Sequence, residues 1–284
     1  MPAARFIGII ISETAMLPDI QSGKETRQIL LQQVGISDLL YPLRIGLSKE
    51  TEKILAEIDF SVQVESTQRG THMSRFIETL NEFTEPLAME NFQKLLESGR
   101  NKLHAQAASA KIRFPYIVLK KAPASEKPSY MTYYCVLSGT NYANPEKNTE
   151  QITLFVPVQT LCPCSKEISA YGAHNQRSKV EVTLQLGSVF QIEDLITCIE
   201  KAASAPLHSL LKREDEKYVT EQAYANPKFA EDLVRDICLS LPALGNFPYA
   251  RVKTTNYESI HNHNAFAAAH GECKDGQFLQ PASI

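Results

Sequence analysis

The order in which hydrophobic periods follow one another is the feature that most constrains the fold of this chain. Alternating apolar residues predict two strands within 41–65, periods of three and four predict helices at about 74–83 and 89–105, and alternation returns at 111–120 and 130–137. The second half repeats this order, with elements expected at about 151–160, 178–186, 192–203, 227–240, 248–257 and 264–269. Strand pairs that flank two helices are typical of an α+β protein with antiparallel sheets and helices on one face.

Three segments are expected along the chain. Residues 1–30 hold no sustained period and predict a tail, in which Met16 is an alternative start. The first strand-strand-helix-helix-strand-strand module is expected over 31–145 and the second, with most of the chemical motifs, over 146–284; the polar stretch 141–148 marks their boundary. A four-stranded sheet with two helices exposes its edges, and exposed edges must be paired or covered, so we expect edge-to-edge homo-oligomerisation.

Charge and cysteine usage narrow the partners and the compartment. The net charge of −3 provides no basic field, so we expect neither nucleic acid nor a membrane surface as a partner. The apolar run 6–11 is too short to span a bilayer and no small-residue cleavage site follows it, which predicts a cytoplasmic protein. In a reducing compartment we expect the six cysteines of the chain to be core residues, metal ligands or catalytic residues and not to form disulfide bonds.

A segment dense in functional groups, residues 161–178, is expected as a loop between two strands. Cys162 and Cys164 are separated by one residue, Pro163, which is not the Cys-X-X-Cys spacing of a redox site or a zinc ribbon. One of these thiolates together with His174 would supply two ligands of an open metal site, while the other thiol stays available as a nucleophile or proton donor. The alternative is a turn held by Pro163, in which both cysteines are small apolar side chains.

Two imidazoles lie two residues apart near the C-terminus. In a continuing strand His261 and His263 project from the same face, as metal ligands, phosphate donors or a general acid and base. The alternative is a polar strand end with surface histidines, and the neighbouring Glu258 favours the acid–base interpretation.

Two other segments have both a structural and a functional interpretation. The run 211–217 is a charged, solvated helix connection, or it supplies one carboxylate, such as Glu216, to a Cys/His/Glu metal set. At 70–76 the serine is an ordinary helix cap, or the backbone N–H groups bind an anion together with His72 and Arg75. The chain has no Gly-rich phosphate loop and no dinucleotide fingerprint, so a bound nucleotide is not held in the commonest ways.

Several of these segments together resemble type IB GTP cyclohydrolase I. They are Leu161–Ile168, Gly172–Ser178, Gly70–Phe76, Glu258–His263, Pro18–Gln21 and the stretch 34–42. The resemblance covers about residues 17–267. It implies the tunnelling fold, built from two tandem ββααββ modules, and a homotetramer with active sites between subunits. It also implies GTP as the substrate: the imidazole ring is opened, C8 leaves as formate and the ribose rearranges to give 7,8-dihydroneopterin triphosphate, a precursor of folate-type pterins and deazaguanine nucleosides.

The same resemblance implies a metal and two essential thiols. One divalent metal per active site, which is zinc, manganese or iron, would have Cys162, His174 and Glu216 as its ligands. Cys162 and Cys164 are then catalytic, and Cys164 is the thiol that faces the substrate.

The resemblance also implies residues that handle protons and bind GTP. Proton transfer is implied for His261 and His263. The implied triphosphate contacts are His72, Arg75, Lys166 and Arg177. The guanine edge presents two donors that one carboxylate accepts together, and this carboxylate is either Glu231 or Glu258.

Two other functions remain open from the sequence. A related tunnelling-fold nitrile reductase of deazaguanine metabolism uses a cysteine thiolate and NADPH but no metal, and the pairing of Cys162 with His174 argues against it. A structural protein would use Cys162, Cys164 and His174 as a closed zinc site. Chelation would then unfold the chain, whereas loss of a catalytic ion abolishes turnover and leaves the fold largely intact.

Overall fold

The computed structural model describes residues 19–21, 23–46, 52–188 and 190–281. Most of the predicted tail, including Met16, lies outside these ranges. The last part of that segment is attached to the first module. The Glu25 N–H donates to the carbonyl of Thr67 at 3.0 Å, and the Arg69 N–H donates to the carbonyl of Gly23 at 3.1 Å.

The first half contains the predicted order of two strands, two helices and two strands. Its elements are β1 (Leu31–Ile45), β2 (Glu52–Val64), α1 (Ser74–Glu82), α2 (Phe92–Lys102), β3 (Ala107–Lys121) and β4 (Pro128–Tyr142). β1 begins well before the predicted start at residue 41 because the alternation is broken inside the strand. Its register with β2 shifts between Ile36 and Leu39, and Asp38 has a φ of +55°.

The second half repeats this order and adds further elements to it. The repeated elements are β5 (Thr149–Leu161), β6 (Asn175–Gln185), α4 (Ile192–Ala202), α6 (Ala230–Ser240), β8 (Phe247–Asn256) and β9 (Ala265–Lys274). The added elements are α3 (Pro163–Ile168), β7 (Ala205–Pro206), α5 (Arg213–Ala225) and β10 (Gln277–Leu279).

The two added helices correct two expectations from the sequence. The loop expected over 161–178 contains α3, and most of the connection expected at 211–217 belongs to α5. The hydrophobic periodicity does not indicate α5, because few residues of this helix face the protein interior and not all of those are apolar. Asp215 and Ala223 are buried and Val219 is half-buried, while most of the helix is polar and exposed.

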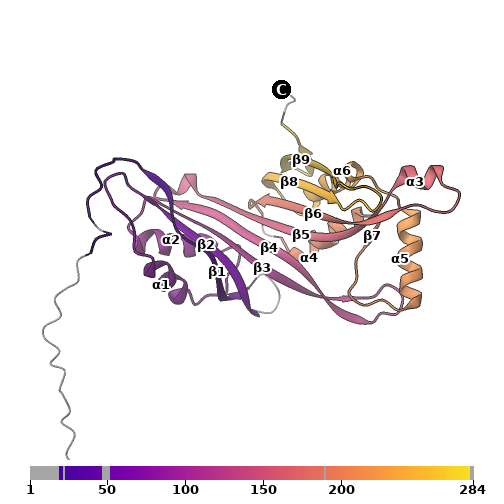
Figure 1. Cartoon of the computed structure of the whole chain (residues 1–284), viewed down its shortest axis with the longest axis horizontal. Helices are drawn as coiled ribbons and strands as arrows, with labels where there is room; N and C mark the ends of the chain where they lie inside the picture. Colours follow the sequence, from indigo (N-terminus) through magenta and orange to yellow (C-terminus); the bar gives the residue numbers. More distant parts are fainter. Residues whose placement is uncertain (1–18, 22, 47–51, 189, 282–284) are drawn as a thin grey trace, which may run out of the picture.

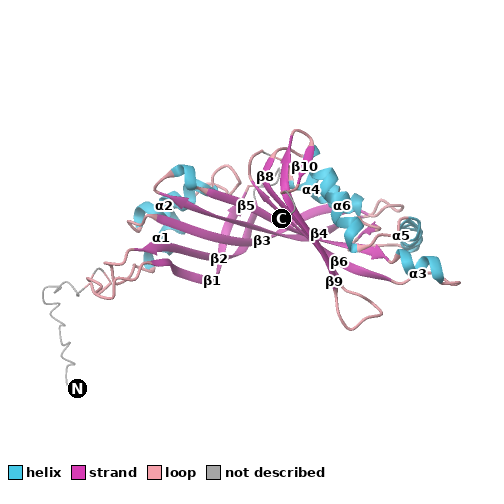
Figure 2. Ribbon diagram, turned by 90° about the horizontal axis from the view of Figure 1, so that it is seen from above, coloured by secondary structure: helices cyan, strands magenta, loops and turns pink. Residues whose placement is uncertain are grey.

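The strands of the described residues form one antiparallel sheet, in which β4 pairs with β5 and so joins the two halves. Neighbouring strands follow the order β1-β2-β3-β4-β5-β6-β8-β9-β10 (Figures 1 and 2). Cross-strand partners share a face of a sheet. One row of partners consists of Ile58, Ile112, Leu137, Ile152 and Leu184, all of which are buried. The apolar face is therefore continuous across both halves.

The four helices of the repeated pattern pack on this apolar face, which confirms the α+β class. α1 and α2 cover the first half, where the rings of Phe60 and Phe76 meet edge to face with centroids 5.3 Å apart. α4 and α6 pack on each other and on strands of the second half. No helix within the described residues is long and apolar enough to cross a membrane.

The β3–β4 hairpin of the first half extends to the helices of the second half and is fixed there by polar contacts. Lys120 Nζ donates to both carboxylate oxygens of Glu200 in α4, at 2.7 and 2.8 Å. The Tyr133 hydroxyl donates to the same carboxylate at 2.8 Å. These contacts, together with the β4–β5 pairing, hold the two halves in one arrangement.

Candidate functional site

The candidate site lies where β5 ends and β6 begins, at the end of the molecule that carries α3 (Figure 1). Cys162 is the N-cap of α3, and Pro163 occupies the first helical position, which proline favours. The backbone N–H of Cys162 donates to the carbonyl of His174 at 3.1 Å. The connection between the strands therefore folds back on itself and brings the backbones of these two predicted ligands side by side.

Ser165 ties the two residues together. Its hydroxyl donates to the carbonyl of Cys162 at 3.2 Å and accepts from the backbone N–H of His174 at 3.1 Å. Its own backbone N–H donates to the sulfur of Cys162 at 3.5 Å. The sulfur of Cys162 thus faces the first turn of α3, whereas Cys164 is exposed on that helix.

The imidazole of His174 stands on a chain of buried polar side chains. Its Nδ1 lies 3.1 Å from Gln176 Oε1, and Gln176 Nε2 donates to Thr160 Oγ1 at 2.9 Å. Thr160 Oγ1 lies 2.8 Å from Ser178 Oγ, which donates to Asn256 Oδ1 at 2.7 Å. The four residues beneath His174 are buried on neighbouring strands, and we call them the Gln176 relay.

A third segment, the loop 257–264 between β8 and β9, lies against His174. Ser259 Oγ is 3.4 Å from His174 Nδ1. The backbone N–H of Tyr257 donates to the carbonyl of Arg177 at 3.0 Å, which fixes the start of the loop on β6. Arg177 itself has an exposed side chain at this end of the molecule.

This loop carries His261, His263 and Glu258. β8 ends at Asn256, close to the expected end of the strand, so the two histidines lie in the loop and not in a continuation of the strand. The two imidazoles nevertheless stack, with ring centroids 5.1 Å apart and planes inclined by 19°. Both are exposed and Glu258 is half-buried. All three groups therefore belong to the loop that contacts His174.

α5 passes beside the site and separates two of the predicted residues. Lys166 Nζ donates to the carbonyl of Tyr224 at 2.5 Å and lies 4.4 Å from the centre of its ring, so it is engaged with the last turn of α5. Glu216 is exposed in the first turn of α5, eight residues earlier, which is about 12 Å along a helix. Across the described ranges, no group of three or more His, Cys, Asp or Glu side chains is arranged to hold a metal ion. Cys162, His174 and Glu216 therefore do not converge within one chain.

Asp215 anchors the first turn of α5 to the β3–β4 hairpin. Its carboxylate accepts hydrogen bonds from the backbone N–H groups of Ala124, Ser125 and Lys212, each at 2.8 Å, and from the Ser125 hydroxyl at 2.6 Å. Burial alone would raise the pKa of Asp215, but these hydrogen bonds outweigh burial and hold the pKa below its usual range. Glu216, the next residue, therefore stands on a fixed helix end.

Of the predicted guanine-binding carboxylates, Glu231 lies in the first turn of α6 and is exposed. The segment before that turn is held at the site, because the backbone N–H of Lys228 donates to the carbonyl of Leu161 at 3.0 Å. Glu231 and Glu258 are thus carried by two different segments that both touch the site.

His72 and Arg75 lie at the entrance of α1, at the opposite end of the long axis of the molecule (Figure 1). His72 Nε2 pairs with Asp19 Oδ2 at 3.2 Å, and Arg75 Nη1 donates to the carbonyl of Lys102 at 3.4 Å. The predicted triphosphate contacts are therefore divided between the two ends of one chain.

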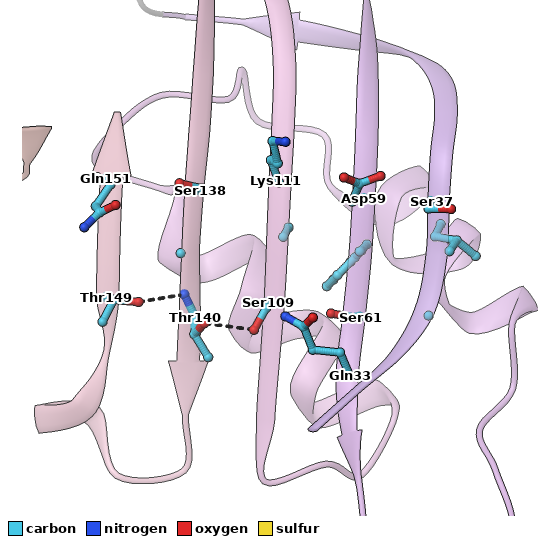
Figure 3. Close-up of a pocket in the computed structure, with 15 residues that line it drawn as sticks. Gln33, Ser37, Asp59, Ser61, Ser109, Lys111, Ser138, Thr140, Thr149 and Gln151 are labelled. Atoms are coloured by element: carbon cyan, nitrogen blue, oxygen red, sulfur yellow. Dashed lines mark hydrogen bonds between the residues drawn. The ribbon is translucent and has the colours of Figure 1, made fainter. Parts of the chain in front are cut away.

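The polar face of the sheet carries a hollow that the hydrophobic periodicity of the sequence does not predict. It has a volume of about 630 Å³ and lies over the strands of the first half and the start of β5 (Figure 3), and Cys162 is not among the residues that line it. Small side chains such as Ser109 and Ser138 line it together with the longer Asp59 and Lys111. Serines at outward-facing positions of adjacent strands are the sequence signal that would have located it.

Comparison with known proteins gives a consistent family. A family model described as type I GTP cyclohydrolase folE2 matches residues 17–267. A relative named GTP cyclohydrolase FolE2 from Syntrophus aciditrophicus is 46% identical over 250 residues, which cover 88% of this chain and 97% of the relative. Relatives of the same name come from Thermosipho melanesiensis, with 46% identity and coverage of 93% and 100%, and from Dictyoglomus thermophilum, with 47% identity and coverage of 88% and 96%.

Among solved structures, uricases share a distant likeness with the chain. The uricase from Arthrobacter globiformis has a TM-score of 0.47 at 8% identity and covers 89% of this chain and 95% of its own. A uricase from Bacillus fastidious has a TM-score of 0.48 at 8% identity, with coverage of 85% and 93%. Neither likeness bears on the chemistry of the site.

Proposed function

Since the chain belongs to the type I GTP cyclohydrolase FolE2 family, we propose that it is a GTP cyclohydrolase I. The reaction opens the imidazole ring of GTP by hydrolysis, releases C8 as formate and rearranges the ribose to give 7,8-dihydroneopterin triphosphate. In the structure, the observation that carries the proposal is the meeting of Cys162, His174 and the loop 257–264 at one end of the sheet.

The donors at this end fit one divalent cation in part. Cys162 offers a sulfur that faces the first turn of α3, and its backbone is hydrogen-bonded to that of His174. The Nδ1 of His174 is engaged with Gln176, and its Nε2 has no hydrogen-bond partner among the described residues. Thiolate and imidazole suit several transition metals, which leaves zinc, manganese and iron as candidates. A cation held there would supply Lewis acidity for the hydrolytic steps. Because Glu216 does not converge with this pair in one chain, we expect this ligand to come from a second copy.

The surrounding groups have distinct tasks in this proposal. The exposed thiol of Cys164 faces the substrate, and the stacked His261 and His263 hold and transfer protons during formyl hydrolysis and rearrangement of the sugar. One carboxylate accepts hydrogen bonds from the guanine N1–H and exocyclic amine. Glu231 and Glu258 are the two candidates for this carboxylate, and the segments that carry them touch the site.

A complete site requires a homo-oligomer, for which we propose a tetramer. The predicted triphosphate contacts His72 and Arg75 lie at the other end of the chain from Cys162 (Figure 1). In the described chain β1 pairs with β2 and, at its end, forms a single bridge between Ile45 and Leu87, while β10 pairs only with the last three residues of β9. Such open edges favour pairing with another copy, which would bring opposite ends of two chains together.

Metal-reconstituted protein incubated with GTP tests the activity. We expect formate release and, after oxidation, a fluorescent pterin. Cys164→Ala should retain the metal and lose formate release, whereas Cys162→Ala should lose the metal. Cys198→Ala, in α4, is the matched control and should stay active. Normal turnover by both site variants would show the assignment of the thiols to be wrong.

Subunit mixing tests the location of the site. We expect His72→Ala and Cys164→Ala to be inactive as separate preparations. After joint unfolding and refolding, mixed oligomers should regain part of the activity, because some interfaces combine an intact His72 with an intact Cys164. No recovery from oligomers shown to be mixed would argue against a shared site.

The two alternative functions receive no support from the site. A closed structural zinc site needs Cys162, Cys164 and His174 to converge, and the part of the chain that the structure describes contains no such group. The family match also points away from a nitrile reductase. All six cysteines are unpaired, which supports a cytoplasmic location.

A further inference from the structure

We propose that Gln176 is a positioning residue that holds His174 in the tautomer with an unprotonated Nε2. The inference rests on the proposed role of His174 as a metal ligand. A neutral imidazole carries its proton on one ring nitrogen, and only the other nitrogen can bind a cation. The partner of Nδ1 therefore decides whether Nε2 is available.

The hydrogen bonds at Gln176 assign the proton of the imidazole. Gln176 Nε2 donates to Thr160 Oγ1 at 2.9 Å, which turns Gln176 Oε1 toward His174 Nδ1 at 3.1 Å. An amide oxygen only accepts, so this contact requires the proton of His174 to lie on Nδ1, and the Ser259 hydroxyl, 3.4 Å from the same nitrogen, then acts as an acceptor. Nε2 then keeps its lone pair for a cation.

The far end of the Gln176 relay keeps the amide of Gln176 in this orientation. Thr160 accepts from Gln176, so its own proton is directed at Ser178 Oγ, 2.8 Å away. Ser178 donates in turn to Asn256 Oδ1 at 2.7 Å. Thr160 is 0% exposed, Ser178 1% and Asn256 3%. Turning a single member would leave buried groups of the same kind facing each other, which is costly where water does not replace the lost partner.

The position of the Gln176 relay in the sheet also indicates a role beyond packing. Deeper in the same three strands, the corresponding cross-strand row is Leu154, Val182 and Val252, all buried and apolar. Polar side chains replace such residues toward the end of the sheet that carries His174. Buried polar groups add little net stability compared with apolar packing, so their concentration at this end is explained by what they orient.

Two substitutions of Gln176 separate positioning from packing. Leucine fills similar space without an acceptor, while glutamate retains an acceptor for the Nδ1 proton and accepts from the Thr160 hydroxyl instead of donating to it. We expect Gln176→Leu to weaken Zn²⁺ binding about 10–100-fold, the usual effect of losing the outer partner of a ligating histidine, and Gln176→Glu to bind Zn²⁺ as the native protein does. Affinity is measured on the intact oligomer without GTP, by competition with a chromophoric chelator. Gln185→Leu, on the same strand, is the control and should leave the affinity unchanged.

A second readout follows the ligands themselves. Co²⁺ bound to the native protein and to Gln176→Glu should give the same absorption spectrum, with its sulfur-to-metal band and nitrogen-dependent bands, whereas Gln176→Leu should give a changed spectrum. If Gln176→Leu does not fold, Gln176→Met supplies a more adaptable apolar side chain for the same test.

The outcomes distinguish this inference from its premise. Native-like Zn²⁺ affinity and Co²⁺ spectrum in Gln176→Leu, together with weakened binding in His174→Ala, overturn the positioning role alone. Native-like affinity in His174→Ala overturns the proposed ligand and the positioning role with it. Weakened binding in both Gln176→Leu and Gln176→Glu also overturns it, because a retained acceptor would then not be sufficient.

Discussion

Replacing Glu150 by glutamine should stabilise the protein at pH 8 and change its stability little at pH 4.5. Glu150 is the second residue of β5, and its Oε1 is buried with no hydrogen-bond partner among the described residues. Burial raises the pKa of this carboxyl to about 7; a hydrogen bond from Gln93 opposes the rise, and the nearby charge of Glu90 adds to it.

The size of the effect follows from the difference between the folded and unfolded pKa values. The folded protein retains the proton of Glu150 up to about pH 7, whereas the unfolded chain releases it near the ordinary value of 4.5. The contribution of the protonated Glu150 carboxyl to the unfolding free energy is therefore fully present below pH 4.5 and is lost as the pH rises through 7. The whole shift corresponds to about 3 kcal/mol, which partial solvent exposure of the side chain reduces to about 1–2 kcal/mol. Glutamine stays neutral and escapes this loss.

Urea unfolding of both proteins at pH 4.5 and pH 8, at one protein concentration, measures the effect. We expect a gain in unfolding free energy of about 1–2 kcal/mol for Glu150→Gln at pH 8 only. Glu146→Gln, which changes an exposed glutamate in the preceding turn, is the control and should behave as the native protein at both pH values. Equal effects of Glu150→Gln at the two pH values would refute the reasoning.

Two further substitutions test the packing between elements. In Gly99→Ala the new Cβ would lie 2.3 Å from Phe60 Cζ, so the helix must shift, and we expect a loss of about 1–3 kcal/mol by urea unfolding; a gain, as expected from helix propensity alone, would contradict this. Lys120→Met leaves the carboxylate of Glu200 without its ammonium partner and should cost about 3 kcal/mol, while Lys121→Met, on the exposed neighbour, should cost almost nothing. Equal effects of the two lysine substitutions would show that the buried pair contributes no more than a surface charge.

Much of the fold could be predicted from the sequence because its core strands alternate regularly. Strands such as β3 and β5 place apolar side chains at every second residue, and α2 and α6 carry apolar stripes at helical spacing. The elements that were missed break these periods. β10 is only three residues long, although the turn before it, Asp275-Gly276, has positive φ at both residues and is a sequence signal for a hairpin.

The candidate site could be predicted only where its residues are close in sequence. Cys162 and His174 lie in one connection between paired strands, so the chain itself brings them together. Glu216 depends on the direction of α5, and periodicity did not detect that helix. The Gln176 relay could have been found from the sequence. Thr160 and Ser178 are polar residues at positions where the alternation of the strands predicts buried apolar ones.

The pairing of β4 with β5 makes the two halves one rigid unit instead of two domains joined by a hinge. One cluster of buried side chains extends from Leu43 to Cys273 and crosses the boundary without interruption. Cutting the chain at 143–148 and separating the pieces would leave β4 and β5 each without a neighbouring strand. It would also expose buried apolar side chains on both pieces to water. Neither piece should then fold stably alone. Any opening or closing around Cys162 and Cys164 must arise in the surface loops near them, because the sheet does not bend between the two halves.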